Sequence, residues 1–305
     1  MFNFITKLQS GDSSIPPPPI EKKPSPPQLH ENPKHMVVYE NNECSNSTLK
    51  CWYGRFGNQF IRNVCASFLA KKYDLKFQYK FQNDIQNMGI DLFTDGTRFH
   101  KKTLSFKDEY FDKFMDNDTS VETVWDGTEE PTPETHNIDV NFIYLQTRTT
   151  AKYIRNYVNE REIAIKNSNP FRERYGNNND IFIHLRLGDA LHYAPPFDYY
   201  RDTIIEVLKR SSNGGFGKRF ISSDTLNHPL CQKLIYDFGL FPIQMNEINT
   251  IQFASTCSNI ILSNGTFSWL IGVLAFNSNI YYPQIKTVWH GDIFIFPDWN
   301  EMAIG

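Results

Sequence analysis

The C-terminal half of this 305-residue chain alternates short apolar runs with longer stretches of helical periodicity. The apolar runs, rich in Ile, Phe and Tyr, cover residues 181–183, 219–221, 259–262 and 280–282. Helical patterns separate them at residues 199–210, 230–238 and 267–276. Strands that are joined through a helix pair in parallel, because an antiparallel neighbour needs only a short turn. The sequence therefore predicts an α/β fold with a parallel, doubly wound sheet in this half.

The first half has a weaker pattern. A strand-like run at 49–53 precedes a helix that is expected to begin near Asn58, where apolar residues recur at i, i+4 spacing. Residues 83–140 are rich in Asp, Asn, Thr and Gly, and we expect few regular elements there. At about 150 residues per domain, the length suggests two globular domains. We expect a flexible proline-rich leader at 1–35 and domains at 36–170 and 171–305.

Charge and cysteine content exclude several classes of protein. The net charge is −3 with dispersed Lys and Arg, so the basic stripe of a nucleic-acid binder is absent. Five cysteines without a CxxC pair indicate neither a disulfide framework nor a zinc site, although a Cys44–Cys51 disulfide remains an alternative. Cys65, Cys231 and Cys257 have apolar neighbours and are predicted to be buried thiols. We see no signal sequence and no run of ~20 apolar residues, and therefore expect a soluble cytoplasmic protein.

In doubly wound sheets, ligands bind beyond the carboxyl ends of the strands, so the residues after each strand are the informative ones. After the first strand, His184 and Arg186 are predicted to share a face, and Gly188 permits a tight turn before Asp189. An arginine at this place can bind a diphosphate through two parallel charge-assisted bonds. The alternative is structural, with His184 a satisfied core histidine and Asp189 an N-cap or a partner for Arg186.

The next two strands also end in polar residues. Asp224 can accept two hydrogen bonds from the N–H donors of a guanine, or it can cap the following helix together with Thr225. Thr266, Phe267 and Ser268 open a helix whose N-terminus can hold a phosphate, although Thr266 or Ser268 can equally be plain helix caps.

Three sequence blocks in this order resemble the signatures of the α1,2-fucosyltransferase family and its relatives, which include protein O-fucosyltransferases. The blocks are GRFGNQ at 54–59, HLRLGD at 184–189 and SNGTFSW at 263–269, and the resemblance spans roughly residues 50–285. The first block carries Phe56 where the family more often has leucine. The second has Arg186 followed by Leu187 in place of paired arginines.

The resemblance implies a GT-B-like architecture, with two Rossmann-like domains that each hold a parallel sheet and a donor site in the C-terminal one. It implies inverting transfer of fucose from GDP-fucose to a hydroxyl of a glycan, with an α1,2 linkage expected and no metal or other cofactor required. Site residues carried over from the family are Arg186 on the β-phosphate, His184 and Asp224 on the guanosine, Thr266, Phe267 and Ser268 around the phosphate and base, and Arg55 and Asn58 facing the donor sugar or acceptor. The general base is not identified. Asp189 joins Arg186 as a candidate catalytic residue, with a structural role favoured.

Three alternatives remain open at this stage. The donor can be another GDP-deoxyhexose such as GDP-rhamnose, because the guanine and diphosphate contacts would be the same. A metal-dependent GT-A transferase would use 116–118, Asp-Asn-Asp, as its metal motif. A non-catalytic glycan-binding protein would use its aromatic residues for stacking on sugars and would not bind GDP.

Overall fold

A computed structural model describes residues 55–77, 79, 81–100, 103–116, 132–134, 136–140, 143–210, 217–284 and 292–304. The predicted leader at 1–35, the strand-like run at 49–53 and the Cys44–Cys51 pair lie outside these residues. Of the candidate metal motif at 116–118, only the end of a helix at Asp116 is described.

The main sheet has six strands in the order β5-β4-β3-β6-β7-β8, and every neighbouring pair is parallel. Its strands are β3 (Ile181–Leu185), β4 (Arg219–Ser223), β5 (Phe241–Pro242), β6 (Asn259–Ile261), β7 (Asn279–Pro283) and β8 (Asn300–Met302). The chain runs outward from β3 to one edge, returns to the middle and runs outward from β6 to the other edge. This is the strand order of a Rossmann-like sheet, and it reverses between β3 and β6.

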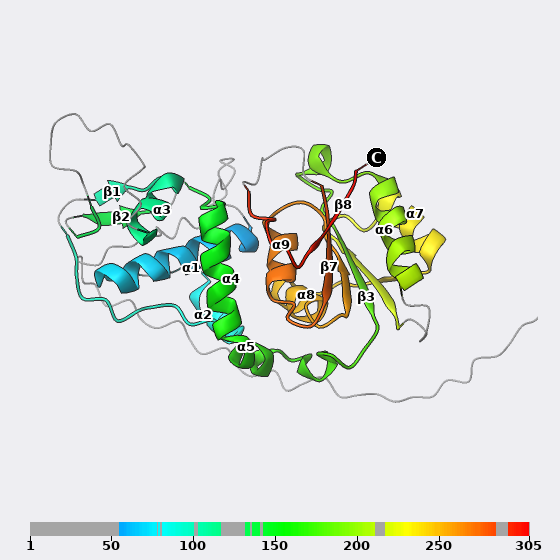
Figure 1. Ribbon diagram of the computed structural model, residues 1–305, viewed down its shortest axis with the longest axis horizontal. Helices are drawn as coiled ribbons and strands as arrows, with labels where there is room; N and C mark the ends of the chain where they lie inside the picture. Colours follow the sequence, from blue (N-terminus) through cyan, green and yellow to red (C-terminus); the bar gives the residue numbers. More distant parts are fainter. Residues whose placement is uncertain are drawn as a thin grey trace, which may run out of the picture. The chain divides into compact units, whose positions relative to one another are not determined.

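Side chains alternate across the sheet and fill two separate cores. Ile181, Ile183 and Leu185 of β3 face one core, whereas Phe182 faces the other. The core behind Ile183 is covered by α6 (Phe197–Arg210) and α7 (Pro229–Phe238). The opposite face is covered by α8 (Glu247–Ala254) and α9 (Thr266–Val273), so helices lie on both sides of the sheet (Figure 1). The predicted doubly wound α/β arrangement is confirmed for this half.

The first half is mainly helical in its described part. Its elements are α1 (Phe56–Tyr73), α2 (Gln82–Asn87), β1 (Thr103–Ser105), α3 (Asp108–Asp116), β2 (Asn137–Asp139), α4 (Arg148–Glu160) and α5 (Glu162–Ser168). Two short 3-10 turns, η1 (Arg172–Arg174) and η2 (Leu191–Tyr193), flank β3 in the chain. The only sheet found in the described part of this half is the parallel pair β1 and β2. A second Rossmann-like domain at 36–170 therefore stays a prediction.

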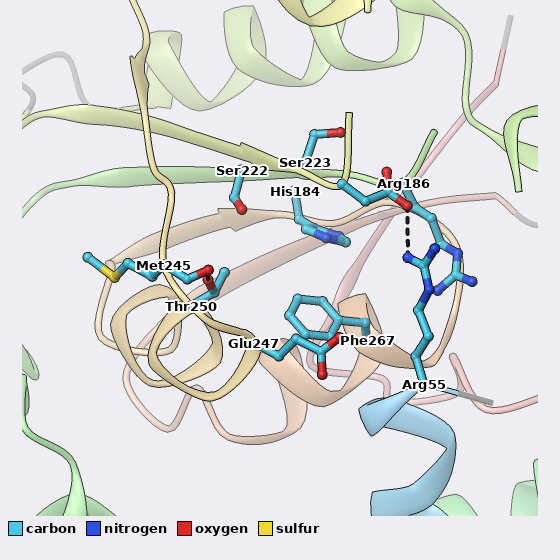
Figure 2. Close-up of a pocket in the computed structure, with 10 residues that line it drawn as sticks. Arg55, His184, Arg186, Ser222, Ser223, Met245, Glu247, Thr250 and Phe267 are labelled. Carbon is cyan, nitrogen blue, oxygen red and sulfur yellow. Dashed lines mark hydrogen bonds and ion pairs between the residues drawn. The ribbon is translucent and has the colours of Figure 1, made fainter. Parts of the chain in front are cut away.

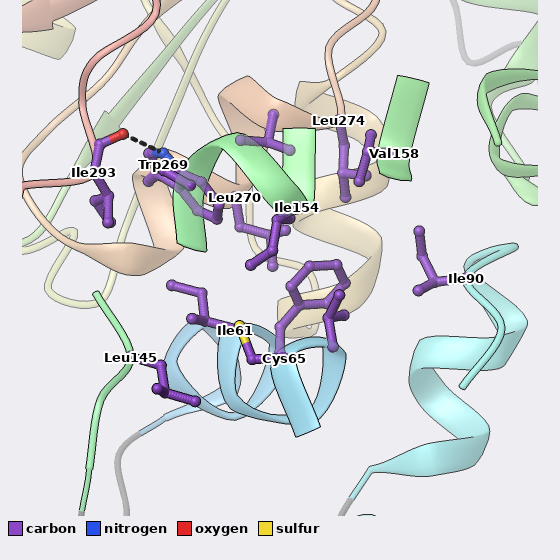
Figure 3. Packing of buried hydrophobic residues seen from close by; sticks show 14 of the residues in the cluster. Ile61, Cys65, Ile90, Leu145, Ile154, Val158, Trp269, Leu270, Leu274 and Ile293 are labelled. Carbon is purple, nitrogen blue, oxygen red and sulfur yellow. Dashed lines mark hydrogen bonds between the residues drawn. The ribbon is translucent and has the colours of Figure 1, made fainter. Parts of the chain in front are cut away.

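One hydrophobic core runs from the first half into the second. Ile61 and Cys65 of α1 and Ile154 of α4 pack in the same cluster as Trp269 of α9 (Figure 3). The Trp269 side chain is fully buried, and its indole N–H donates a 2.8 Å hydrogen bond to the carbonyl of Ile293. The predicted burial of the Cys65, Cys231 and Cys257 thiols is confirmed. Because α1 and α9 share a core, their N-termini are held in a fixed relation.

That relation depends on a glycine. A Cβ atom on Gly57 would lie 2.8 Å from the backbone nitrogen of Phe267 and 2.9 Å from the Thr266 hydroxyl oxygen. Both contacts are shorter than a carbon atom tolerates, and the first is with backbone that has little room to move. Gly57 therefore allows the first turn of α1 to contact the first turn of α9.

We predict that Gly57→Ala destabilises the protein by about 1–3 kcal/mol, the usual cost of forcing an extra methyl group into a packed interface. Urea unfolding followed by circular dichroism measures this loss. Lys71→Ala is the control, because it puts an alanine on the exposed face of α1, away from the contact with α9. Equal unfolding midpoints for the two variants would show that the α1–α9 contact is not tight.

Candidate functional site

The candidate site lies at the carboxyl ends of β3 and β6, where the strand order reverses. Two hydrogen bonds connect the end of β3 and the residue after it with the segment that follows β6. The His184 imidazole Nδ1 lies 2.6 Å from the Ser268 hydroxyl, and the Arg186 backbone N–H donates to the Ser263 hydroxyl at 3.3 Å. The second and third sequence blocks are therefore in direct contact, although they are about 80 residues apart.

A cavity of about 140 Å³ opens at this position (Figure 2). It is lined by the N-cap residue of α1, by the ends of β3 and β4, by the segment that follows β5, and by α8 and α9: Arg55, His184, Arg186, Ser222, Ser223, Asp224, Met245, Glu247, Thr250 and Phe267. Five of the predicted site residues, Arg55, His184, Arg186, Asp224 and Phe267, are thus brought together around one cavity.

Two arginines and two aspartates form an ion-pair cluster at one end of the cavity. Arg55 lies 3.0 Å from Asp224 Oδ2 and 3.5 Å from Asp189 Oδ1. Arg186 lies 3.0 Å from both carboxylate oxygens of Asp189. The alternative that Asp189 is a partner for Arg186 therefore holds. The cluster is electrically balanced, with two positive and two negative side chains.

The Asp224 carboxylate also holds the loop that follows β3. Its Oδ1 accepts hydrogen bonds from the backbone N–H groups of Leu187, at 2.9 Å, and Gly188, at 3.1 Å. Partial burial raises the pKa of Asp224, but these two bonds and the Arg55 guanidinium outweigh burial and lower the pKa overall. The alternative that Asp224 caps the next helix is wrong, because His228 caps α7 by accepting from the Leu230 N–H.

His184 is buried beside the cavity and neutral at physiological pH. Burial lowers its pKa to about 3, while the nearby Asp224 carboxylate opposes this effect and the Arg186 guanidinium adds to it. Its ring centroid lies 5.0 Å from that of Phe267, which is half-buried at the start of α9. The two rings give the middle of the cavity an aromatic wall.

The helix α9 begins within the third block, and no side chain caps its N-terminus. Gly265 stands at the N-cap of α9 with φ of 101°, a conformation that favours glycine. The hydroxyls of Thr266 and Ser268 make other contacts, so the capping alternative is wrong for both. The Thr266 hydroxyl donates to the side-chain Oδ1 of Asn58 at 2.6 Å, and the Gln146 side-chain amide donates to the same atom at 3.1 Å. Asn58 and Thr266 thus join α1 to α9 and do not line the cavity.

Several site residues are absent from the sequence-based prediction. Met245, Glu247 and Thr250 line the cavity from the segment that follows β5, and Gln146 holds Asn58. The rule that ligands bind after strand ends would have found Glu247 if β5 had been recognised. That strand has only two residues, both exposed, and one of them is Pro242.

A second and larger cavity, of about 970 Å³, lies between α1, α4 and α5. Its lining includes Phe68 of α1, Phe93, and Tyr153 and Tyr157 of α4. None of the residues in the three sequence blocks lines it. The chemistry predicted from the sequence therefore belongs to the smaller cavity.

No group of three or more His, Cys, Asp or Glu side chains in the described segments is placed to hold a metal ion. None of the described helices combines the length and apolarity required to cross a membrane. Comparison of the chain with protein-family models, with curated proteins and with solved structures gives no match. The α/β fold and the geometry of the cavity are therefore the basis for a functional proposal.

We predict that His184→Asn makes stability less sensitive to acid. The folded-state pKa of His184, about 3, lies below its value of 6.5 in the unfolded chain. Between these values the unfolded chain binds a proton that the folded protein does not bind, so stability falls as pH falls below 6.5. From pH 7.5 to 5.5 the wild type should lose about 1.4 kcal/mol more than the variant, the equivalent of one pH unit of proton binding.

Urea unfolding at the two pH values measures this difference. His192→Asn is the control, because it makes the same substitution at an exposed position. If the wild type and His184→Asn lose the same stability, His184 titrates normally and does not stay neutral in the folded protein.

Proposed function

We propose that this protein is an inverting glycosyltransferase that transfers fucose from GDP-fucose to a hydroxyl of a glycan acceptor. The observation that carries the proposal is that the three sequence blocks meet at one cavity: Arg55 comes from the first, His184 and Arg186 from the second and Phe267 from the third. The cavity also lies at the switch point of a parallel sheet, where nucleotides bind in such folds. The two rings of His184 and Phe267 suit a base, and the guanidinium groups of Arg55 and Arg186 suit a diphosphate joined to it.

In this proposal the diphosphate of the donor replaces Asp189 as the partner of Arg186. The Asp189 side chain is 56% exposed, and a pair with so exposed a member contributes about 0–1 kcal/mol. A charge-assisted hydrogen bond to a phosphate is worth roughly 1.5–3 kcal/mol. The exchange is therefore favourable. Asp189 holds Arg186 in position until the donor arrives, and this is the structural role favoured from the sequence.

Transfer breaks the bond between the anomeric carbon of fucose and the β-phosphate oxygen, and forms a bond from that carbon to the acceptor oxygen. Negative charge grows on the departing GDP as the bond breaks. Arg186 and the N-terminus of α9 stabilise that charge more strongly in the transition state than in the ground state, which lowers the barrier. The acceptor hydroxyl loses its proton to a base in the acceptor complex. His184 is poorly suited to that role, because its pKa of about 3 makes it a weak base.

The first half of the chain supplies the other side of the site in a GT-B-like arrangement. The side chain of Arg55, at the start of α1, is 47% exposed and forms ion pairs with both Asp189 and Asp224. When the donor displaces Asp189, Arg55 stays paired with Asp224 and its remaining N–H groups can contact the fucose or the acceptor. An α1,2 linkage is the expected one, and GDP-rhamnose is the alternative donor.

We predict that Arg186→Lys folds normally but loses most of its affinity for GDP and most of its transfer activity. Lysine keeps the charge but lacks the planar pair of donors that matches a phosphate. Calorimetry with GDP, GDP-fucose and UDP measures binding, and a donor panel with GDP-rhamnose measures sugar specificity. Arg201→Lys is the control, because Arg201 pairs with Asp198 and Asp202 on α6, away from the cavity. Wild-type turnover by Arg186→Lys would contradict the role of Arg186 on the diphosphate.

We also predict that transfer continues in millimolar EDTA. Arg186 and the α9 N-terminus already provide positive charge at the diphosphate, so a divalent ion is not needed to balance the leaving group. The same reasoning predicts that Asp116→Ala combined with Asp118→Ala leaves the rate nearly unchanged. Complete loss of transfer in EDTA, restored by one particular divalent ion, would favour the metal-dependent alternative instead.

A further inference from the structure

The residue that distinguishes guanine from other bases is a separate question from the binding of the diphosphate. A carboxylate recognises guanine by accepting two parallel hydrogen bonds, from the ring N1–H and from the exocyclic amino group, with its two oxygens side by side. The sequence assigns this role to Asp224. In the structure, Oδ1 of Asp224 already accepts from Leu187 and Gly188, and Oδ2 accepts from Arg55.

These contacts leave Asp224 without a free pair of oxygens. A carboxylate oxygen has two lone pairs, and both lone pairs of Oδ1 are used by the two backbone N–H groups. To turn toward a base, Asp224 would have to release the loop that positions Arg186. The same side chain cannot hold that loop and also read the guanine edge.

A second carboxylate lines the same cavity. Glu247 is the first residue of α8, and Asn246 caps this helix by accepting from the Asn249 N–H at 2.8 Å. A negative charge in the first turn of a helix is favourable, so the helix N-terminus stabilises an ionised Glu247. Among the described residues, no hydrogen-bond or ion-pair partner is found for its carboxylate. In Figure 2, Glu247 lies beside Phe267 in the lower half of the view, and Ser222 and Ser223 lie in the upper half.

The lining of the cavity therefore combines positive, aromatic and negative groups. Arg55 and Arg186 contribute positive charge, Phe267 and His184 form the aromatic wall, and Glu247 contributes an unpaired carboxylate. A ligand that suits all three features carries an anionic group, a flat ring and two adjacent N–H donors. Guanine has those donors side by side. Adenine has an acceptor next to its amino group, and the single N–H of uracil lies between two carbonyl oxygens that a carboxylate repels.

We propose that Glu247 determines specificity for guanine, by accepting hydrogen bonds from N1–H and from the amino group of the base. The inference rests on the proposed function, since it places the base of a GDP-sugar in this cavity. Asp224 is then a positioning residue that holds the Leu187–Gly188 loop and acts on the diphosphate through Arg186. The hydroxyls of Ser222 and Thr250, which also line the cavity, lie on the walls around the base.

Calorimetric titration with GDP, IDP and ADP tests this assignment in the wild type, Glu247→Gln and Asp224→Asn. IDP lacks only the amino group of guanine. The wild type should bind GDP roughly 10- to 100-fold more tightly than IDP, the value of one hydrogen bond to a charged group. Glu247→Gln should lose most of that preference, because its amide presents one acceptor and one donor. Asp224→Asn should weaken GDP and IDP by the same factor and keep their ratio. Glu109→Gln, an exposed change in the first turn of α3, should alter neither value.

The outcomes separate this inference from the proposed function. A wild type that binds GDP and IDP equally well, or a preference of that size that survives in Glu247→Gln, overturns the role of Glu247 and leaves GDP binding intact. A preference that disappears only in Asp224→Asn returns guanine recognition to Asp224. If the wild type binds neither GDP nor GDP-fucose, the proposed function fails and the inference fails with it. Glu247 is exposed, so Glu247→Gln should keep the wild-type melting temperature, which confirms that the variant is folded.

Discussion

The candidate site depends on one carboxylate. Asp224 follows β4, accepts two hydrogen bonds from the backbone of the loop after β3, and pairs with Arg55 at the start of α1. Three segments that are far apart in the sequence thus meet at a single side chain. A hydrogen bond to a charged group contributes more than one between neutral groups, so these contacts hold the loop more firmly than backbone turns alone would. The lowered pKa of Asp224 keeps this carboxylate ionised through the physiological range.

Under the proposed function, this arrangement keeps both arginines paired in the free protein. Arg186 is held by Asp189 and Arg55 by both aspartates, so both guanidinium groups already lie at the cavity before a donor binds. Beneath them, Gly57 lets the first turns of α1 and α9 touch, and Asn58 is bonded to Thr266 across that contact. Much of the ordering that binding normally costs is already present in the fold.

The sequence predicts the sheet well because its strands are buried on both faces. The central strand β3 is buried at all five positions, which gives it the unbroken apolar run typical of a parallel sheet. The predicted strands and helices of this half all occur, with ends displaced by a few residues. The sequence does not predict the strands β5 and β8 or the helix α8. The strand β5 is two exposed residues long, and β8 has three residues, none of them buried. The helix α8 is buried on most sides, so it lacks the periodic stripe that identifies a surface helix.

The site itself is only partly predictable, because local sequence patterns do not reveal contacts between distant residues. Residues that follow strong strands, such as His184 and Arg186, are found from local pattern. Their actual partners depend on contacts that span 84 residues for His184 and Ser268 and 208 residues for Asn58 and Thr266. One sequence does not reveal which of two plausible roles a side chain takes. Asp224 was expected to contact a ligand or to cap a helix, and in the structure it ties loops together.

The proposed function is tested most directly by locating where a nucleotide binds, because the proposal places GDP in the cavity beyond the carboxyl ends of the strands. Hydrogen–deuterium exchange followed by mass spectrometry, with and without GDP, locates the binding site in the intact protein. The account predicts slower exchange at 186–189, 222–225, 246–250 and 265–268, with no change at 153–164, which line the larger cavity. Protection confined to 153–164, or no protection under conditions where GDP binds, would contradict it.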